Sequence, residues 1–304
     1  MSETPSEASP EKGAIGKWFG SVSAAIFAQP AYTIVLRLTL LIFILHGSSD
    51  VGLEVLLMIL CGTMLVFPAL LQSRVLWMSV CGCVWWLNAV DWVWIDNHKF
   101  LMSYWCLACA LAVQTSKPGE VLKVNAIALI GLTFLFASWW KIATGEYVDG
   151  SFMYFSLLTD YRLELLGTLF GGAGAEVFAE AAAVYETLEE YPEAGASVTL
   201  PEHSGLRWFA MASSWWTLVI EGAVALIFLL RFSKFRIPAV LPDLLLIVFI
   251  ATTYVFIPVI GFGYILAVMG LAACPDERRK TRVVYLLLFA LLQVGQLPLD
   301  RWLL

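Results

Sequence analysis

The sequence contains little charge for its length. Of its 304 residues, 14% are Asp, Glu, Lys or Arg, whereas 60% are hydrophobic and the mean hydropathy is +0.81. Soluble globular domains carry about 25% charged residues, so this chain lacks the charge that a water-exposed surface needs. The composition excludes a soluble enzyme and predicts an all-α fold, a multi-pass transmembrane helical bundle in contact with membrane lipids.

Several kinds of functional site are also missing from the sequence. A net charge of −6, with no basic patch between aromatic residues, excludes a nucleic-acid-binding protein. No group of His, Cys and carboxylate residues has metal-ligand spacing, and there is no phosphate-binding glycine loop or nucleophile elbow. The six cysteines lie in or at the end of apolar runs. A packing role is therefore favoured over a redox role, even for the Cys106-Leu-Ala-Cys109 motif.

Eight apolar stretches are long enough to enter a membrane. A crossing needs about 20 apolar residues, with a range of about 17–25. Residues 1–12 are predicted to form a disordered tail, and 13–29 a helix lying at the membrane interface. The predicted membrane segments are 31–48, 53–72, 75–95, 99–115, 122–143, 208–230, 240–274 and 282–298.

The stretch at 240–274 is too long for one ordinary crossing and is flanked by basic residues. Short loops rich in Lys and Arg stay in the cytoplasm, so both flanks share a side and the stretch folds back on itself. The sequence therefore predicts eight or nine membrane segments and a cytoplasmic N-terminus. The basic flanks are Arg231, Lys234 and Arg236 before the stretch, and Arg278, Arg279, Lys280 and Arg282 after it; Pro258, Gly261 and Gly263 mark the predicted turn.

One long connection, at about 144–206, lies outside in this topology. It holds eleven acidic residues and a single basic residue, Arg162. Its first part is apolar except for Asp160, Arg162 and Glu164, which predicts an interfacial or re-entrant helix, since charges at the bilayer centre are costly. Its second part predicts a helix with an acidic face that ends at Pro192. That helix is either a solvated lid or a docking surface for a partner.

Two ionisable residues fall inside predicted spans. Arg37 lies about 9 Å above the inner end of the first span, and Glu221 about 15 Å above the inner end of the sixth, by helical rise. Long side chains can bridge such a difference. The interpretation favoured here is a structural ion pair between Arg37 and Glu221, and the alternative is a role in a proton or substrate path.

Two segments at the outer ends of neighbouring spans combine ionisable and aromatic side chains. Their topology places His98 and Lys141 at similar depth. An amine in an apolar pocket loses the hydration that stabilises its charged form, so Lys141 can act as a general base. The alternative is a lysine that only anchors the helix end. The segments contain Asp91, Trp92, Trp94, Asn97 and His98 in the first, and Trp139, Trp140, Lys141, Tyr147 and Gly150 in the second.

This combination resembles the HTTM domain family of vitamin K-dependent gamma-carboxylase-like membrane proteins. The resemblance rests on an Asn-His pair at a helix start, an aspartate seven residues before that His, and an Ala-x-x-x-Lys helix end followed by Tyr-Val-Asp-Gly. The early span with Arg37 is similar to the family's opening helix. The resemblance covers roughly residues 15–300, so 13–304 is expected to form one HTTM-like domain. The specific motifs are confined to 91–105 and 137–153.

The resemblance implies a membrane enzyme with its site on the outer face, of the carboxylase and lyase class, in the bacterial inner membrane. It implies a reduced quinone of vitamin K or menaquinone type, no metal, and a peptide or protein substrate outside. The alternative is a non-catalytic accessory, peptide-maturation or immunity factor. In the catalytic case Lys141 would be the base and His98 the second catalytic residue. Asn97 and Asp91 would assist, and Trp94, Trp139, Trp140, Tyr147 and Gly150 would form the pocket.

Overall fold

The computed structural model describes residues 28–45, 51–90, 92–93, 95–190, 198–254 and 259–294. Within these ranges the chain forms twelve α-helices and two short 3-10 helices, with no strand, which confirms the all-α fold class. The expected tail at 1–12 and nearly all of the expected interfacial helix at 13–29 lie outside the described residues.

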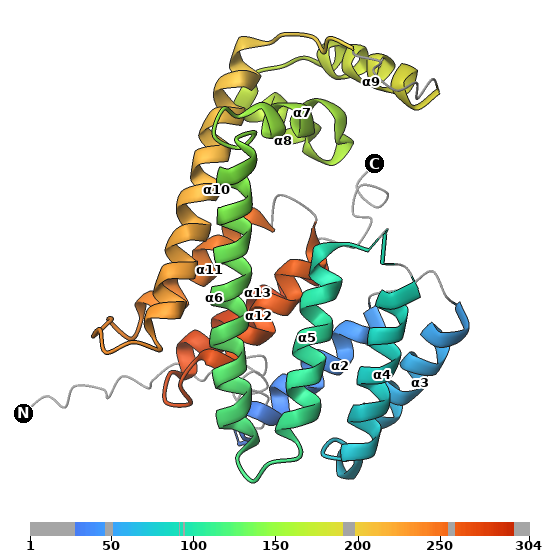
Figure 1. Cartoon of the computed structure of the whole chain (residues 1–304), viewed down its shortest axis with the longest axis vertical. Helices are drawn as coiled ribbons and strands as arrows, with labels where there is room; N and C mark the ends of the chain where they lie inside the picture. The colour runs from blue at the N-terminus through green and yellow to red at the C-terminus, as the bar shows by residue number, and fades with distance from the viewer. Residues whose placement is uncertain are drawn as a thin grey trace, which may run out of the picture.

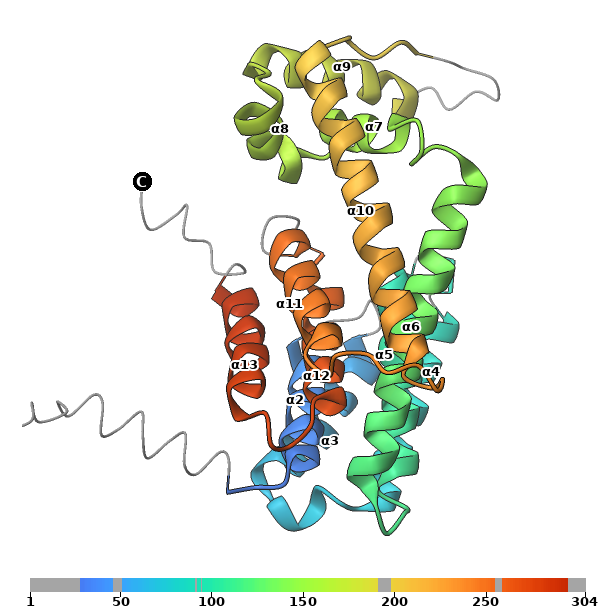
Figure 2. The same ribbon diagram turned by 90° about the vertical axis from the view of Figure 1, so that its left-hand side faces the viewer.

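The helices follow the apolar stretches of the sequence, and they form a bundle with a smaller cap above it (Figure 1). Two long helices, α6 and α10, run antiparallel from the bundle up to the cap (Figure 2). The long helices are α6 (Pro118–Thr144) and α10 (Ser204–Leu230). The bundle also contains α2 (Ala31–Leu45), α3 (Val51–Val66), η1 (Pro68–Leu70), α4 (Arg74–Val90), α5 (Asn97–Ala112), α11 (Leu241–Thr253), α12 (Ile260–Ala273) and α13 (Arg279–Val294). The cap consists of α7 (Ser151–Thr159), η2 (Tyr161–Leu163), α8 (Glu164–Gly171) and α9 (Ala175–Glu190).

The pair α6 and α10 gives the molecule its long dimension. Each helix has 27 residues and is long and apolar enough to cross a membrane. At 1.5 Å per residue each is roughly 40 Å long. The other apolar helices of the bundle are shorter; α2, α3, α4, α11 and α12 have 13 to 17 residues.

The 240–274 stretch folds back as predicted. Its described residues form α11, which ends at Thr253, and α12, which begins at Ile260, and the two helices contact each other. The two basic flanks therefore meet at one end: Arg231 Nη2 donates to the Ala273 carbonyl at 3.3 Å, and Arg278 Nη1 to Asp243 Oδ2 at 3.1 Å. Two details of the predicted turn differ. Gly261 and Gly263 lie inside α12, and Pro258 is outside the described residues.

The apolar interior has two parts, and α10 contributes to both. The bundle core includes Val224 and Phe228 of α10, whereas the cap core includes Leu206 and Ala210 from the first part of the same helix. Glu221 follows Ile220, the first residue of α10 in the bundle core, so this polar residue lies at the edge of that core that is nearer the cap.

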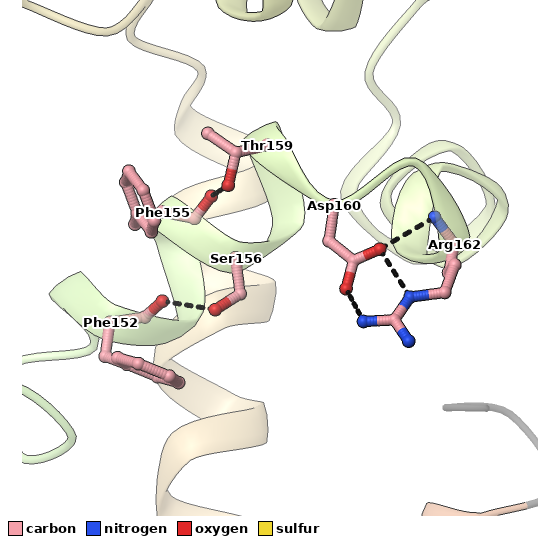
Figure 3. A network of polar contacts seen from close by, with 6 residues as sticks. All are labelled: Phe152, Phe155, Ser156, Thr159, Asp160 and Arg162. Atoms are coloured by element: carbon pink, nitrogen blue, oxygen red, sulfur yellow. Dashed lines mark hydrogen bonds and ion pairs between the residues drawn. The ribbon is translucent and has the colours of Figure 1, made fainter. Parts of the chain in front are cut away.

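The charged middle of the cap explains why residues 151–171 do not form one helix (Figure 3). Asp160 ends α7, and its Oδ1 accepts hydrogen bonds from Arg162 N at 3.0 Å and Arg162 Nε at 2.8 Å. Its Oδ2 lies 2.5 Å from Arg162 Nη2. The two resulting helices have nine and eight residues, too short to cross a bilayer, as expected for an interfacial element. The Arg162 guanidinium also holds the pKa of Asp160 below its usual range.

We expect Asp160→Ala to loosen η2, the short turn that precedes α8. The substitution removes the side-chain acceptor for a backbone N–H, a loss that typically costs about 1 kcal/mol. Amide hydrogen exchange should become faster for residues 161–166, and Asp160→Asn should give an intermediate effect. Because the folded pKa of Asp160 is depressed, its contribution is present above the unfolded pKa and is lost as the pH falls through the folded value. Unchanged exchange in Asp160→Ala would contradict this role.

Candidate functional site

The site is built around an ion pair between the two long helices. Lys141 lies in the last turn of α6, and Glu221 lies on α10. Lys141 Nζ is 2.5 Å from Glu221 Oε1 and 2.6 Å from Oε2, and the two side chains are 15% and 8% exposed. A charge with so little access to water is stable only when it is paired, so each residue depends on the other.

Close helix packing sets the register that brings these two residues together. A Cβ atom at Gly131 of α6 would lie 2.8 Å from the Leu229 side chain of α10, so only glycine allows this approach. Ten residues further along α6 is Lys141, and eight residues back along α10 is Glu221. Because the helices are antiparallel, this step from the glycine contact brings the two side chains face to face.

The turn after α6 places Tyr147 next to the ion pair. Gly145 ends α6 with φ +80°, and Gly150 begins α7 with φ +76°. A Cβ at Gly150 would lie 3.2 Å from the Met211 Cα atom of α10, so this position requires glycine for space as well as conformation. Between the two glycines, the Tyr147 ring centroid lies 4.9 Å from Lys141 Nζ, within the range of a cation–π contact. Burial, with a contribution from the Glu221 charge, raises the pKa of Tyr147 to about 12.

His98 belongs to a different part of the bundle than Lys141. It is buried in the first turn of α5, its Nδ1 lies 3.9 Å from Asp96 Oδ2, and its ring centroid is 5.7 Å from that of Phe262 on α12. Phe262 in turn stacks on Tyr254, with centroids 6.2 Å apart. His98 therefore packs against an aromatic pair formed by the end of α11 and the start of α12.

The predicted ion pair between Arg37 and Glu221 is wrong. Arg37 Nη1 instead donates to Gln29 Oε1 at 2.9 Å, and Glu221 binds the lysine of α6. The prediction placed the inner ends of the first and sixth spans at the same level. In the structure α10 ends beside the middle of α6, near the Gly131–Leu229 contact (Figure 1). Glu221, eight residues before Leu229, therefore lies further from the lower end of the bundle than the prediction assumed.

The other predicted pocket residues are placed as follows. Trp139 and Trp140 are 68% and 69% exposed, so they lie on the outer surface of α6 and do not enclose the lysine amine. Asn97 is the exposed first residue of α5. Asp91 and Trp94 lie outside the described residues.

Two contacts in this region were not predicted from the sequence: the pairing of Glu221 with the lysine, and the packing of Phe262 against His98. Each joins residues that lie far apart along the chain. Cys106 and Cys109 are buried free thiols, in agreement with a packing role. Among the described residues, no group of three or more His, Cys, Asp and Glu side chains is arranged to hold a metal ion.

Comparisons of the chain with protein-family models, with curated proteins and with solved structures gave no match. Function is therefore inferred from the geometry around Lys141.

Proposed function

We propose that the chain is a multi-pass protein of the bacterial inner membrane that transfers a proton at the outer boundary of the bilayer. Its support is the apolar pair α6 and α10, together with five shorter apolar helices packed into the same bundle. Large apolar side chains on the outer faces of the long helices are exposed, among them Leu132, Val219 and Leu226. Contact of such a surface with lipid would be favourable, whereas its exposure to water would be unfavourable.

Fusion reporters test the topology. We expect reporters placed after Lys117, Arg236 and Lys280 to be cytoplasmic, because Lys and Arg in short loops stay inside. A reporter near Glu190, in the acidic cap, is expected to be external. Alkaline phosphatase and fluorescent-protein fusions read the two sides directly. A cytoplasmic signal at Glu190 would move Lys141 to the inner face and overturn the proposed placement of the site.

The proposed chemistry rests on one observation: both carboxylate oxygens of Glu221 bind the Lys141 ammonium in a nearly buried setting. In this state the amine carries its proton and cannot accept another. It can receive a proton from a bound acid only while it passes one of its own protons to Glu221. The result is a protonated Glu221, an ammonium at Lys141 and an anion beside that ammonium. Glu221 is thus the net base, and Lys141 is the relay and the counter-ion.

The residues present fit a reduced quinone as the bound acid. Lys141 can stabilise a phenolate-type oxygen, and the Tyr147 ring lies against the same amine. When bound, a reduced quinone supplies an acidic hydroxyl and reducing equivalents. The resemblance assigns such a molecule to a carboxylase-like lyase with a peptide or protein substrate outside. In that proposal Lys141 and Glu221 move the proton, and Tyr147 orients the hydroxyl.

Oxygen uptake by the protein in lipid nanodiscs supplied with a reduced quinone tests this function, because the resemblance implies that dioxygen oxidises the deprotonated quinol. We expect Glu221→Gln to reduce turnover at least about 100-fold, since general acid–base groups contribute roughly 10²–10⁴-fold. The amide still accepts a hydrogen bond from Lys141, but it is not a base. The matched control is Glu120→Gln, which changes the exposed ion pair between Lys117 and Glu120 and should be silent. Full turnover in Glu221→Gln would refute the proposed relay.

A non-catalytic accessory, peptide-maturation or immunity factor is the second candidate. The observation that favours it is the ion pair itself, because a fully paired ammonium and carboxylate can simply join α6 to α10. In that case the acidic cap would bind a peptide or protein partner, and Lys141 would need only its charge. Substituting arginine for Lys141 separates the two functions, because only the relay needs a group that can release a proton.

A further inference from the structure

A cavity of about 360 Å³ lies where the cap meets the bundle. Its walls come from α7, η2 and α8 of the cap and from α10, and Thr252 and Thr253 at the end of α11 close it from the bundle. This volume falls within the range of sites that bind small molecules. The cavity is separate from the ion pair: neither Lys141 nor Glu221 lines it.

The lining of this cavity is suited to hydrocarbon. Of the twelve described residues that line it, eight are apolar and none is charged. Four hydroxyl residues complete the wall, but two of them are already engaged: Thr217 donates to the Ser213 carbonyl at 2.8 Å, and Thr252 donates to the Val248 carbonyl at 2.8 Å. The wall therefore offers mainly apolar contact area, and an apolar chain needs no donor from it.

The opening of the cavity lies on the apolar outer surface. Phe170 and Trp216 line the cavity and are 63% and 45% exposed, so they stand at its mouth. Phe170 also stacks on Phe209, another lining residue, with ring centroids 5.4 Å apart. Next to the mouth, Leu165 and Leu169 of α8 are exposed on the same helix. An opening framed by aromatic and aliphatic side chains would face lipid, not water.

We propose that this cavity binds one acyl chain of a membrane lipid or fatty acid. The inference rests on the proposed membrane placement, but not on the proton transfer at Lys141. A prenylquinone differs from an acyl chain in its two ring oxygens, which require hydrogen-bond donors that a hydrocarbon chain does not, so menaquinone is the competitor that distinguishes the two ligands. A peptide is a poorer fit, because its backbone groups would be buried without partners.

Photolabelling of the full chain in lipid nanodiscs tests the proposal. The probe is a long-chain fatty acid with a diazirine near its terminal methyl group, and mass spectrometry identifies the labelled peptides. We expect saturable labelling of α8 and α10 peptides. Ser213→Trp fills the cavity and should reduce this labelling at least tenfold. Val219→Trp, an exposed position of α10 outside the cavity, should stay within twofold of wild type.

Competition and a second variant complete the design. Ala212→Phe, which fills the cavity with a smaller change, should give the same loss if Ser213→Trp fails to fold. Competition by oleate alone indicates a fatty acid, and competition by phosphatidylglycerol also indicates a phospholipid chain; either supports the proposal. Displacement by menaquinone but by neither acyl competitor would overturn it, as would undiminished labelling of the filled variants. Lys141→Arg should label normally, so a failed proton relay would not affect this result.

Discussion

Replacing Lys141 with alanine is expected to lower the free energy of unfolding by about 3–5 kcal/mol, the usual effect of breaking a buried ion pair. The substitution leaves Glu221, which is 8% exposed, without its counter-charge. The lysine considered alone suggests the opposite result, because truncating an unpaired buried amine removes an unfavourable group. Because Lys141 is paired with Glu221 across α6 and α10, we expect the substitution to lower the free energy of unfolding and not to raise it.

A double substitution distinguishes the ion pair from simple loss of packing. Lys141→Met combined with Glu221→Leu should recover most of the stability, since hydrophobic replacements of buried ion pairs are often neutral or stabilising. Lys117→Ala is the control, because its pair with Glu120 is 70% and 71% exposed and should contribute no more than about 1 kcal/mol. Unfolding in mixed micelles measures all three. Equal stability of Lys141→Ala and wild type would show that Glu221 has another partner.

The positions of most helices could be predicted from the sequence. Apolar runs near bilayer length define them, and the basic segments around 240–274 predicted that this stretch folds back, which the Arg231–Ala273 and Arg278–Asp243 contacts confirm. Asp160 and Arg162 in an apolar run also predicted an element that does not cross the bilayer. These signals are local, because each depends on residues within a single segment.

The partners within the site could not be predicted in the same way. Pairing Lys141 with Glu221 requires the register between α6 and α10, which depends on how closely Gly131 approaches Leu229. Counting residues from the end of α10 does not give this register, because α10 ends beside the middle of α6. Likewise, the contact of His98 with Phe262 joins helices that are far apart in the sequence. Motif spacing identified Lys141 and His98 as ionisable residues of interest, but not what each one contacts.

Replacing Lys141 with arginine is expected to abolish quinol-dependent turnover while the protein remains folded. A guanidinium keeps the positive charge and can bind both oxygens of Glu221, so the contact between α6 and α10 persists. It stays protonated at any working pH and cannot pass a proton to the carboxylate. Turnover should therefore fall at least about 100-fold, at the scale of a lost acid–base group.

The arginine variant separates catalysis from anchoring because the two roles require different properties of residue 141. A relay needs a group that both gives and takes a proton, whereas an anchor or a link between helices needs only a cation. Thermal unfolding close to that of wild type, together with lost oxygen uptake, would support the relay. Retained uptake with arginine would leave the ion pair a structural role alone, and the accessory function would become the better account of this protein. The comparison is informative because, unlike alanine, arginine does not leave Glu221 unpaired.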